Sequence, residues 1–491
     1  MTLDIFRQSL GAEATLISRL RDGLIGEGVM IDGPYGPKPL LYADYTASGR
    51  ALVQVEDYVR AHVLPYYANS HTQASFCGAY MNRLRAAARR AIADAINAGP
   101  DDTIIFTGAG ATAAVNHLVA LTGLDRWSGE GPRPVVFVGP YEHHSNILPW
   151  RETAAEVIEI PEAVSGGPDL AALSQALLAH ADRSLLIGAF SAASNVTGVL
   201  TQVDCVTRML KRHGALAFWD YAAGAPYLPI DMNKTPDGAM DALYFSPHKF
   251  LGGPGASGVL AVKTGIAAHA RPTWPGGGTV SFVSPWTHRY STSLAAREEA
   301  GTPNMIGDIR AALVLLIKAS IGQDTIDRRE GVFNEMALAR WRANPHIELL
   351  GTGCANRLPI FAMRIKDGQG GYVHHQLVTR MLSDMYGVQA RGGCACAGPY
   401  AHRLLGLDRD ASEDMLAALE RGEELKKPGW MRLNFSYVMS EEGVQRIIDA
   451  VDELASKAAA LAGDYCCNPA TAQFSVNPPS SSADPLLAAN M

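Results

Sequence analysis

Several features that define whole classes of protein are missing from this sequence of 491 residues. The first residues lack the basic-then-apolar pattern of a secretory signal, and no uncharged apolar run reaches the length that spans a bilayer. Cysteine is scarce at seven residues, and an odd number in a long chain does not indicate a disulfide framework. These absences predict a cytoplasmic protein with no membrane partner.

Basic residues are also too few to indicate a nucleic-acid partner. The chain holds 42 Lys and Arg against 49 Asp and Glu, a formal net charge of -7. No basic cluster reverses this balance, and an anionic partner calls for a positive surface. The 47% hydrophobic and 19% charged residues are ordinary values for a globular protein, and the length suffices for about two to four domains.

Between about residues 103 and 262, short apolar runs alternate with segments of helical character. The runs fall at 103–106, 135–138, 157–160, 184–190, 215–219, 242–245 and 258–262. Buried strands that alternate with helices are typical of a mostly parallel sheet covered on both faces. The expected fold class is therefore α/β, with a large domain built on such a sheet and a smaller α+β domain after it.

The domain boundaries follow from changes in pattern and composition. Apolar residues near helical spacing predict an N-terminal helical arm at 1–30, and the large domain is expected at 31–310. A small C-terminal domain follows at 311–462. The end of the chain, 463–491, is rich in Pro, Ser, Asn and Ala and is expected to be a disordered tail.

Chemically useful side chains recur just after the ends of the expected strands. They are Thr112, His143, Asn195, Asp220 and Lys249. In open α/β sheets, ligands bind at the carboxyl edge of the strands. We therefore expect these side chains to line one pocket.

Lys249 lies in a Ser-, His- and Gly-rich turn, 246–258, between two apolar runs. Glycines let the backbone approach a ligand, and a dehydrated lysine loses its proton more readily and becomes a nucleophile. Asp220 at a neighbouring strand end suits pyridoxal 5'-phosphate (PLP), with Lys249 forming the Schiff base and the carboxylate keeping the pyridine nitrogen protonated. A surface lysine and a capping aspartate are the plain alternatives. The small-residue turn 108–112 precedes a helix and resembles a phosphate site, although such turns are common.

Four motifs carry a resemblance to a known family. They are Glu-His-His-Ser-Asn at 142–146, Ser-Pro-His-Lys at 246–249, Glu-Ala-Gly-Thr-Pro-Asn at 299–304 and Arg-Gly-Gly-Cys-Ala-Cys-Ala-Gly-Pro at 391–399. Over about residues 40 to 460 the chain resembles the class V aminotransferase family of fold-type I PLP-dependent enzymes, and specifically its cysteine desulfurase and selenocysteine lyase branch. The resemblance implies PLP as the cofactor and a homodimer with a shared active site.

The resemblance also implies a role for each matching residue. Lys249 would form the Schiff base and later act on the substrate, His143 would stack on the ring, and Asp220 would pair with the ring nitrogen. The phosphate would be held by a group of residues in and beside one turn, namely Ala111, Thr112, Ser246 and His248. Thr302 would reach the phosphate of the other subunit. Asn195 would lie near the ring and the substrate. Arg432 would bind the substrate carboxylate, for which a planar guanidinium is suited, and Arg391 would support that end of the pocket.

The cysteine-containing loop distinguishes between reactions. In desulfurases with the pattern Arg-x-Gly-x-x-Cys-Ala-x-Pro the cysteine is the nucleophile, and here this pattern places the role on Cys396. A nearby arginine favours the thiolate. Cys394 is an additional thiol, for which a buried inert role is favoured. A metal site at the two cysteines is not predicted, because no second pair or histidine lies at suitable spacing.

One position departs from the family pattern. Desulfurases typically show Asp-x-x-Gln, whose Gln bonds the phenolic oxygen of PLP, but this chain has Ala223 at that position. The predicted function is a PLP-dependent, cysteine desulfurase-like conversion of L-cysteine to L-alanine with a persulfide on Cys396, which a sulfur-acceptor protein would collect. The alternative is a class V aminotransferase, an epimerase or another PLP-dependent lyase acting on a different amino acid. A non-enzymatic scaffold is the third possibility, and the retained Lys249 and Asp220 argue against it.

Overall fold

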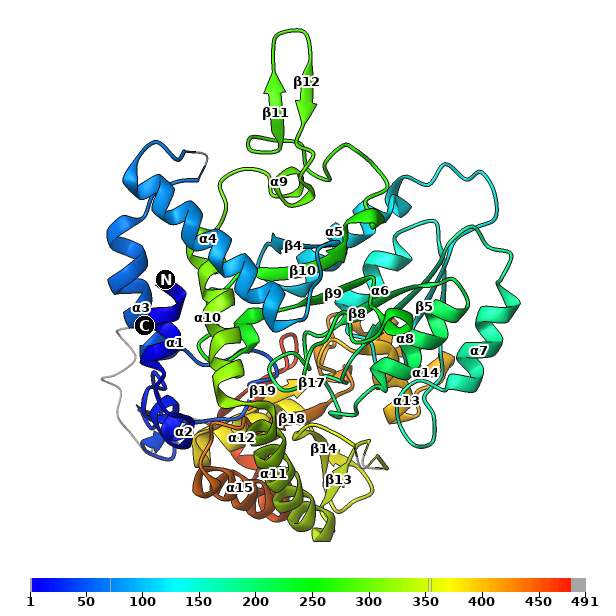
Figure 1. The fold of residues 1–491 in the computed structure, drawn as a ribbon. Coiled ribbons are helices and arrows are strands. Elements are labelled where there is room, and N and C mark those ends of the chain that lie inside the picture. The colour runs from blue at the N-terminus through cyan, green and yellow to red at the C-terminus, as the bar shows by residue number, and fades with distance from the viewer. Residues whose placement is uncertain (1, 71, 352, 355, 478–491) are drawn as a thin grey trace.

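A seven-stranded sheet forms the centre of the larger part of the molecule (Figure 1). The structure is a computed structural model that describes residues 2–70, 72–351, 353–354 and 356–477. In spatial order the strands are β4 (Asp102–Thr107), β10 (Gly258–Lys263), β9 (Ala242–Phe245), β8 (Leu216–Asp220), β7 (Leu186–Ser191), β5 (Val135–Val138) and β6 (Glu156–Glu159). Only β10 runs antiparallel to its neighbours in this sheet, between β4 and β9. The predicted mostly parallel sheet is therefore confirmed.

Helices cover both faces of this sheet because side chains along each strand point alternately to the two sides. Phe137, Trp219 and Phe245 pack in one apolar core, whereas Val136, Phe218 and Tyr244 pack in the other. The first core includes residues of α4 (Phe76–Ala95), α7 (Leu170–Ala179), α8 (Val203–Arg212) and α10 (Met305–Ile321). The second includes residues of α5 (Ala111–Thr122) and α6 (His144–Arg151). This double cover agrees with the α/β class predicted from the apolar runs.

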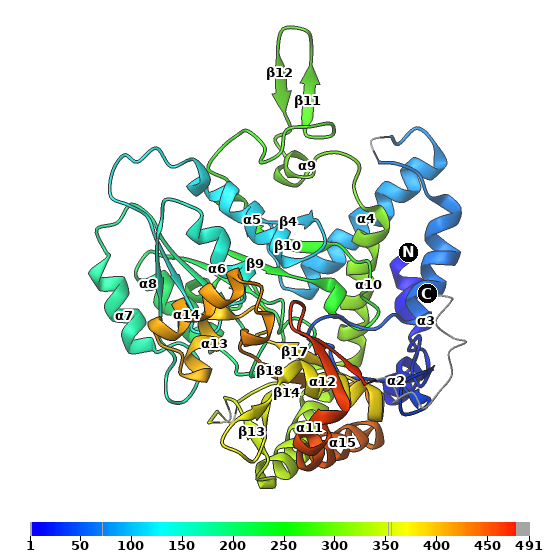
Figure 2. The same ribbon diagram turned by 180° about the vertical axis from the view of Figure 1, so that it is seen from behind.

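A second, antiparallel sheet lies in the C-terminal part of the chain (Figure 2). Its strands are β13 (Ile347–Leu349), β14 (Ile360–Lys366), β18 (Trp430–Asn434) and β17 (Arg391–Gly393), with β15 (Tyr372–Val373) beside β14. An apolar core joins it to α11 (Gln323–Ala343), α12 (His375–Tyr386) and α15 (Glu441–Leu461). Two further helices, α13 (Gly398–Leu405) and α14 (Arg409–Glu420), separate β17 from β18 in sequence. The boundaries of the predicted domains stay predictions.

The N-terminal segment connects these two parts. Helices α1 (Thr2–Ser9) and α2 (Glu13–Asp22) pack their apolar side chains in a core shared with α3 (Val53–Tyr58) and α10. Where the sequence predicted one arm to residue 30, Gly11 interrupts the helix with a φ of 67°, and β1 (Met30–Ile31) pairs with β2 (Lys38–Pro39). Strand β3 (Leu41–Tyr42) then pairs in parallel with β16 (Val388–Gln389). Residues just after β3 are thereby held beside the C-terminal sheet.

The predicted disorder of the tail is wrong for part of its length. Strands β19 (Tyr465–Asn468) and β20 (Gln473–Val476) form an antiparallel hairpin. Tyr465, Phe474 and Val476 pack against the core of the C-terminal sheet, because the apolar residues in these strands alternate with a period of two. Residues 478–491 lie outside the described part of the chain.

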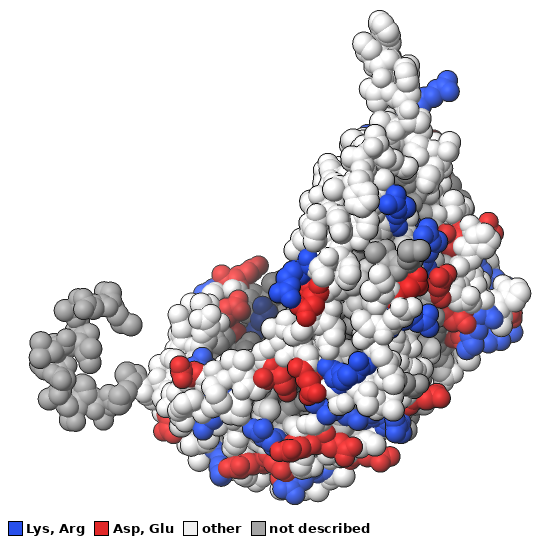
Figure 3. Space-filling model, turned by 60° about the vertical axis from the view of Figure 1, so that its left-hand side comes forward, with Lys and Arg blue, Asp and Glu red and all other residues white. Residues whose placement is uncertain are grey.

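A separate hairpin, β11 (Val280–Val283) and β12 (His288–Tyr290), projects from the molecule near α9 (Leu294–Glu298) (Figure 1). It carries few charged side chains, whereas acidic and basic groups are interspersed over the face below it (Figure 3). Trp286 at its turn is 89% exposed and Val283 is 62% exposed. None of the described helices is long and apolar enough to cross a membrane.

Candidate active site

A cavity of about 590 Å³ lies at the carboxyl ends of the central strands. Every site residue predicted from the sequence except Thr302 lines it. These residues are Ala111, Thr112, His143, Asn195, Asp220, Ser246, His248, Lys249, Arg391, Cys396 and Arg432. The expectation that strand-end side chains meet in one pocket agrees with this geometry.

Lys249 and Asp220 face this cavity from neighbouring parallel strands. Asp220 is the last residue of β8, and Lys249 ends a single 3-10 turn that follows β9. Asp220 is only 4% exposed, its Oδ1 accepts a hydrogen bond of 2.7 Å from the backbone N–H of Ala222, and burial raises the pKa of this carboxyl. Burial lowers the pKa of the Lys249 amine to about 8, against the opposing effect of the Asp220 charge. The amine is therefore much closer to deprotonation than an exposed lysine.

The turn before α5 is packed closely against the turn that contains Lys249. The backbone N–H of Ala111 donates to Ser246 Oγ at 2.9 Å, and a Cβ on Gly110 would lie 2.8 Å from the same oxygen. Thr112 is within 2.7 Å of Ser145, oxygen to oxygen. The N-terminus of a helix of 12 residues, with two hydroxyls beside it, has the donors and the positive end of the helix dipole that an anionic group requires.

His143 forms the cap of α6 and is neutral at ordinary pH. Its Nδ1 accepts a hydrogen bond of 3.1 Å from the backbone N–H of Ser145. Burial lowers its pKa to about 3, helped by the positive charges of Lys249 and Arg432. Glu142, immediately before it, is buried and accepts hydrogen bonds from the N–H of Ser191 and the side chain of Asn146. An uncharged, fixed imidazole ring at the cavity wall is suited to stacking on a flat aromatic ligand.

Cys396 lies in a strained loop at the mouth of the cavity. Both Ala395 and Cys396 have left-handed backbone conformations, with φ of 54° and 55°, which cost energy in residues other than glycine. The side-chain amide of Asn195 donates to the carbonyl of Ala395 at 2.8 Å, and the backbone N–H of His144 donates to the carbonyl of Cys396 at 2.8 Å. Cys396 is exposed, whereas Cys394 is half-buried against an apolar cluster and does not line the cavity.

Two arginines meet at the far end of the cavity. Arg391 and Arg432 lie directly opposite each other on β17 and β18. Asp44 lies with them: its Oδ1 accepts from Arg432 Nη2 at 2.7 Å and its Oδ2 accepts from Arg391 Nε at 3.0 Å. Sequence reasoning assigned no role to Asp44, because its partners are more than three hundred residues away. Thr46, Ser145 and Ser191 also line the cavity without having been predicted.

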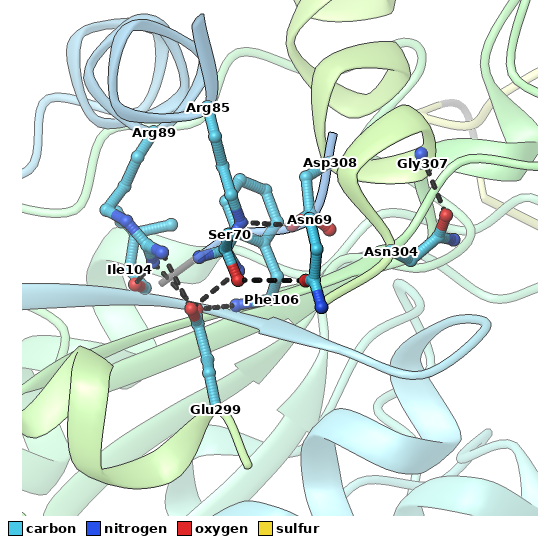
Figure 4. A network of polar contacts seen from close by, with 10 residues as sticks. All are labelled: Asn69, Ser70, Arg85, Arg89, Ile104, Phe106, Glu299, Asn304, Gly307 and Asp308. Atoms are coloured by element: carbon cyan, nitrogen blue, oxygen red, sulfur yellow. Dashed lines mark hydrogen bonds and ion pairs between the residues drawn. The ribbon is translucent and has the colours of Figure 1, made fainter. Parts of the chain in front are cut away.

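Thr302 lies outside this cavity. It lines a neighbouring hollow of about 880 Å³, which shares Ala109 and His248 with the first. An ion cluster fixes the chain just before Thr302 (Figure 4): Glu299 accepts from Arg85 at 2.6 Å and from Arg89 at 2.8 Å, and Arg85 also donates to Asp308 at 2.6 Å. The backbone N–H of Phe106 donates to Glu299 at 2.8 Å, so the segment is tied to strand β4.

The cavity suits an anionic aromatic cofactor. It joins a buried amine, a buried carboxyl, a neutral imidazole and a helix N-terminus. Two buried polar atoms at the arginine end, Asn195 Oδ1 and Arg432 Nε, have no hydrogen-bond partner among the described residues, and buried polar groups usually have one. Within the same described residues, no group of three or more His, Cys, Asp or Glu could hold a metal ion.

Comparison with known proteins gives consistent matches over most of the chain. A family model described as aminotransferase class V matches residues 41–447. A probable cysteine desulfurase of Staphylococcus aureus (strain COL) is 30% identical over 375 residues, which are 75% of this chain and 86% of the relative. A probable cysteine desulfurase of Vibrio cholerae serotype O1 is 28% identical over 419 residues, 84% of this chain and 93% of the relative.

Solved structures resemble the whole fold. The cysteine desulfurase CsdA of Escherichia coli, in an S-sulfonic acid form, is similar with a TM-score of 0.71 at 24% identity, covering 90% of this chain and 98% of that chain. The apo structure of a cysteine desulfurase from Thermococcus onnurineus NA1 has a TM-score of 0.68 at 23% identity, covering 85% and 95%. At these identities the likeness concerns the fold, and it agrees with the fold class predicted from the sequence.

Proposed function

The chain belongs to the class V aminotransferase family, and on this basis we propose that it is a PLP-dependent cysteine desulfurase. It would convert L-cysteine to L-alanine and retain the sulfur as a persulfide on Cys396. The observation that carries the proposal is the meeting of Lys249, Asp220 and Cys396 at one cavity. The names of the curated relatives support the same reaction.

The residues around the cavity fit PLP. Lys249 would hold the aldehyde carbon, Asp220 the ring nitrogen and His143 the ring face. The phosphate would be held at the N-terminus of α5 by the group Ala111, Thr112, Ser246 and His248. Burial lowers the pKa of His248 to about 4, so this histidine would offer a neutral ring to the phosphate. When bound, PLP supplies an electron sink that stabilises negative charge at the substrate Cα.

The two arginines and Lys249 would handle the amino acid itself. Arg432 is 3% exposed and Arg391 is exposed, and both guanidinium groups would bind the substrate carboxylate. Asn195 lines the cavity between this end and the cysteine loop. The Lys249 amine, when it is not holding the cofactor, would remove the Cα proton of the amino acid, because its pKa of about 8 leaves a useful neutral fraction near neutral pH.

Cys396 would then take the sulfur. Its thiolate attacks the substrate sulfur, a new S–S bond forms, and the bond between that sulfur and Cβ breaks. The electron pair of the broken bond stays with Cβ, which takes a proton, and Lys249 returns the proton to Cα to give L-alanine, while Cys396 keeps a persulfide. Because Cys396 is exposed, a thiol of an acceptor protein could reach this sulfur by exchange. A reactive, unpaired thiol also suits the reducing cytoplasm, which we include in the proposal.

A homodimer with a shared site is part of the same proposal. Thr302 lines a hollow next to its own cavity rather than the cavity itself, and this position supports a role for it at the site of a partner subunit. The projecting hairpin exposes Trp286, Val283 and Phe282, the last at 53%. Exposed apolar side chains of this size mark an interaction surface, and a second copy of the chain would cover them.

A second candidate function follows from Ala223. This residue lines the cavity at the position of the family Gln and has no hydrogen-bond donor on its side chain. The substitution favours a PLP-dependent aminotransferase, epimerase or lyase that acts on another amino acid. In that case the products would be a keto acid or an inverted amino acid, with no sulfur on Cys396.

Incubation of the purified protein with PLP and L-cysteine tests both candidates. Alanine and sulfide are assayed together, the sulfide after release by a reducing thiol. Cys396→Ala is expected to abolish both products, and Cys394→Ala, the matched control from the same loop, is expected to retain them. Alanine formation that survives Cys396→Ala at the original rate would refute the persulfide route.

A further inference from the structure

Asp44 is a buried acid that the proposed mechanism does not use. It is 8% exposed, and its two oxygens are each bound to a different arginine of the cavity, at 2.7 Å to Arg432 and 3.0 Å to Arg391. Asp44 itself does not line the cavity. We propose that Asp44 is a specificity-determining residue, which holds the two arginines as a pair and restricts the site to amino acids with a single carboxylate.

The strand register explains why the pair needs an acid. Arg391 and Arg432 are direct partners on the antiparallel strands β17 and β18, so their Cβ atoms are neighbours. Like charges directly opposite each other destabilise a sheet. A carboxylate shared between the two guanidinium groups relieves this repulsion and fixes both side chains on the cavity side of the sheet.

The position of Asp44 is fixed by backbone hydrogen bonds of the residues around it rather than by bonds of its own side chain. The backbone N–H of Ala43 donates to the carbonyl of Gln389 at 3.0 Å, and the N–H of Asn434 donates to the carbonyl of Ala43 at 2.8 Å. The side chain of Asn434 then accepts from the N–H of Thr46 at 2.8 Å. Asp44 is therefore held from both sides between β16 and β18, and it cannot move away from the arginines without breaking these bonds.

The charges at this end of the cavity define the ligand class. Two guanidinium groups and one carboxylate leave one net positive charge for the substrate. Nη1 of Arg432 also donates a hydrogen bond to the carbonyl of Asn195 at 3.0 Å, so part of its donor set is occupied within the chain. One α-carboxylate balances the remaining charge, whereas a second carboxylate on the ligand would find no further positive charge at this end and would be repelled by the nearby charge of Asp44, which contacts both arginines. Selectivity of this kind works by repulsion of the wrong ligand as well as by attraction of the right one.

The test compares two amino acids on the PLP-loaded protein. Binding of L-alanine and of L-aspartate is measured from the visible absorbance of the bound cofactor, with wild type and Asp44→Asn. Asp44→Asn is expected to shift the ratio of the two dissociation constants by about tenfold or more in favour of L-aspartate, the size expected for one unscreened charge near a ligand. The control is Glu56→Gln. It removes a carboxylate that lies outside the cavity and accepts hydrogen bonds from Arg310 at 2.5 and 2.6 Å, and it should leave the ratio unchanged.

A charge-restoring double variant separates charge from folding. Asp44→Asn combined with Arg391→Gln returns the site to one net positive charge, and it is expected to return the ratio toward the wild-type value. If Asp44→Asn fails to fold, the double variant still folds under the proposal, because the repulsion between the arginines is gone. An unchanged ratio in Asp44→Asn, or equal weakening of both amino acids without recovery in the double variant, would overturn the proposal.

A second readout uses the cofactor rather than the amino acid. The charged groups that act on Lys249 are Asp220 and Asp44, which raise its pKa, and Arg432 and Arg391, which lower it, while His143 and His248 adjoin it as neutral rings. Removal of the Asp44 charge should therefore move the pH midpoint of PLP uptake by the apo-protein to lower pH. The inference rests on the proposed function only in placing an amino acid in this cavity. If wild type makes no alanine from L-cysteine, the desulfurase proposal fails while the alanine-to-aspartate ratio still tests Asp44.

Discussion

His144 holds the loop of Cys396 at two points. Its backbone N–H donates to the carbonyl of Cys396 at 2.8 Å, and its ring Nε2 accepts from the backbone N–H of Gly398 at 2.8 Å. The loop held by these contacts includes Cys396, which has a left-handed backbone conformation that persists only where the surroundings enforce it. The backbone on which the Cys396 thiol is carried is therefore fixed by His144, the residue next to His143 of the cavity lining.

Replacement of His144 by Phe keeps the ring volume and removes the acceptor. The N–H of Gly398 would then be left without a partner, at a cost of about 1–3 kcal/mol, and the loop should relax. We expect the rate of persulfide formation to fall by at least about tenfold, because small displacements of a nucleophile are costly, while the absorbance of bound PLP stays. Single-turnover measurements give the rate of persulfide formation. An unaltered rate would mean that the loop keeps its conformation without the contact from His144.

The same contact predicts a dependence on acid. Nε2 can accept only when it carries no proton, and burial lowers the pKa of His144, as does the charge of Arg151. The contact is therefore intact at neutral pH and is lost only as the pH falls through that lowered pKa. The rate at which a neutral reagent alkylates Cys396, corrected for the fraction of thiolate, should change below this pH in wild type. The change should be absent in His144→Phe, and a matching change in the variant would contradict this explanation.

PLP uptake should follow the protonation of Lys249. Only the neutral amine attacks an aldehyde, and burial lowers the pKa of this amine to about 8. The rate of uptake by the apo-protein is therefore expected to rise as the pH rises through about 8 and to level off above it. Lys249→Ala should show no such rise and no stable absorbance band. A midpoint near the ordinary lysine pKa would mean that the amine is solvated.

Restoration of the family Gln at Ala223 should alter the bound cofactor. A donor to the phenolic oxygen of PLP stabilises the anionic form of that oxygen, so the pH at which the visible absorbance of the cofactor changes is expected to fall. One hydrogen bond corresponds to about one pH unit. A spectral titration of Ala223→Gln beside wild type measures the shift. An unchanged titration would mean that another group already makes this bond.

The projecting hairpin should determine the assembly. Trp286→Ser is expected to weaken the dimer, measured by sedimentation at several protein concentrations, and to lower specific activity on dilution. Val164→Ser removes another fully exposed apolar side chain, in the loop after β6, and should leave both unchanged. A monomeric wild type with full activity would contradict the shared site.

The sequence allowed prediction of those parts of the site that short patterns describe. Lys249 and Asp220 follow apolar strands, and parallel strands end at one edge, so their meeting could be predicted. Cys396 was predicted from a loop motif. Asp44 was missed because its function depends on contacts with residues 391 and 432, which no local spacing reveals. The hairpin at 465–476 could not be predicted from composition, because the Pro-, Ser-, Asn- and Ala-rich end of the chain indicates disorder while the alternation of Tyr465 and Phe474 with polar neighbours is short.

The most direct test of the central claim is the mass of the Cys396 peptide after a single turnover with L-cysteine. The account predicts that this peptide gains one sulfur atom, that L-alanine appears in equal amount, and that Lys249→Ala gives neither. A Cys396 peptide of unchanged mass in a protein that still makes L-alanine would contradict it.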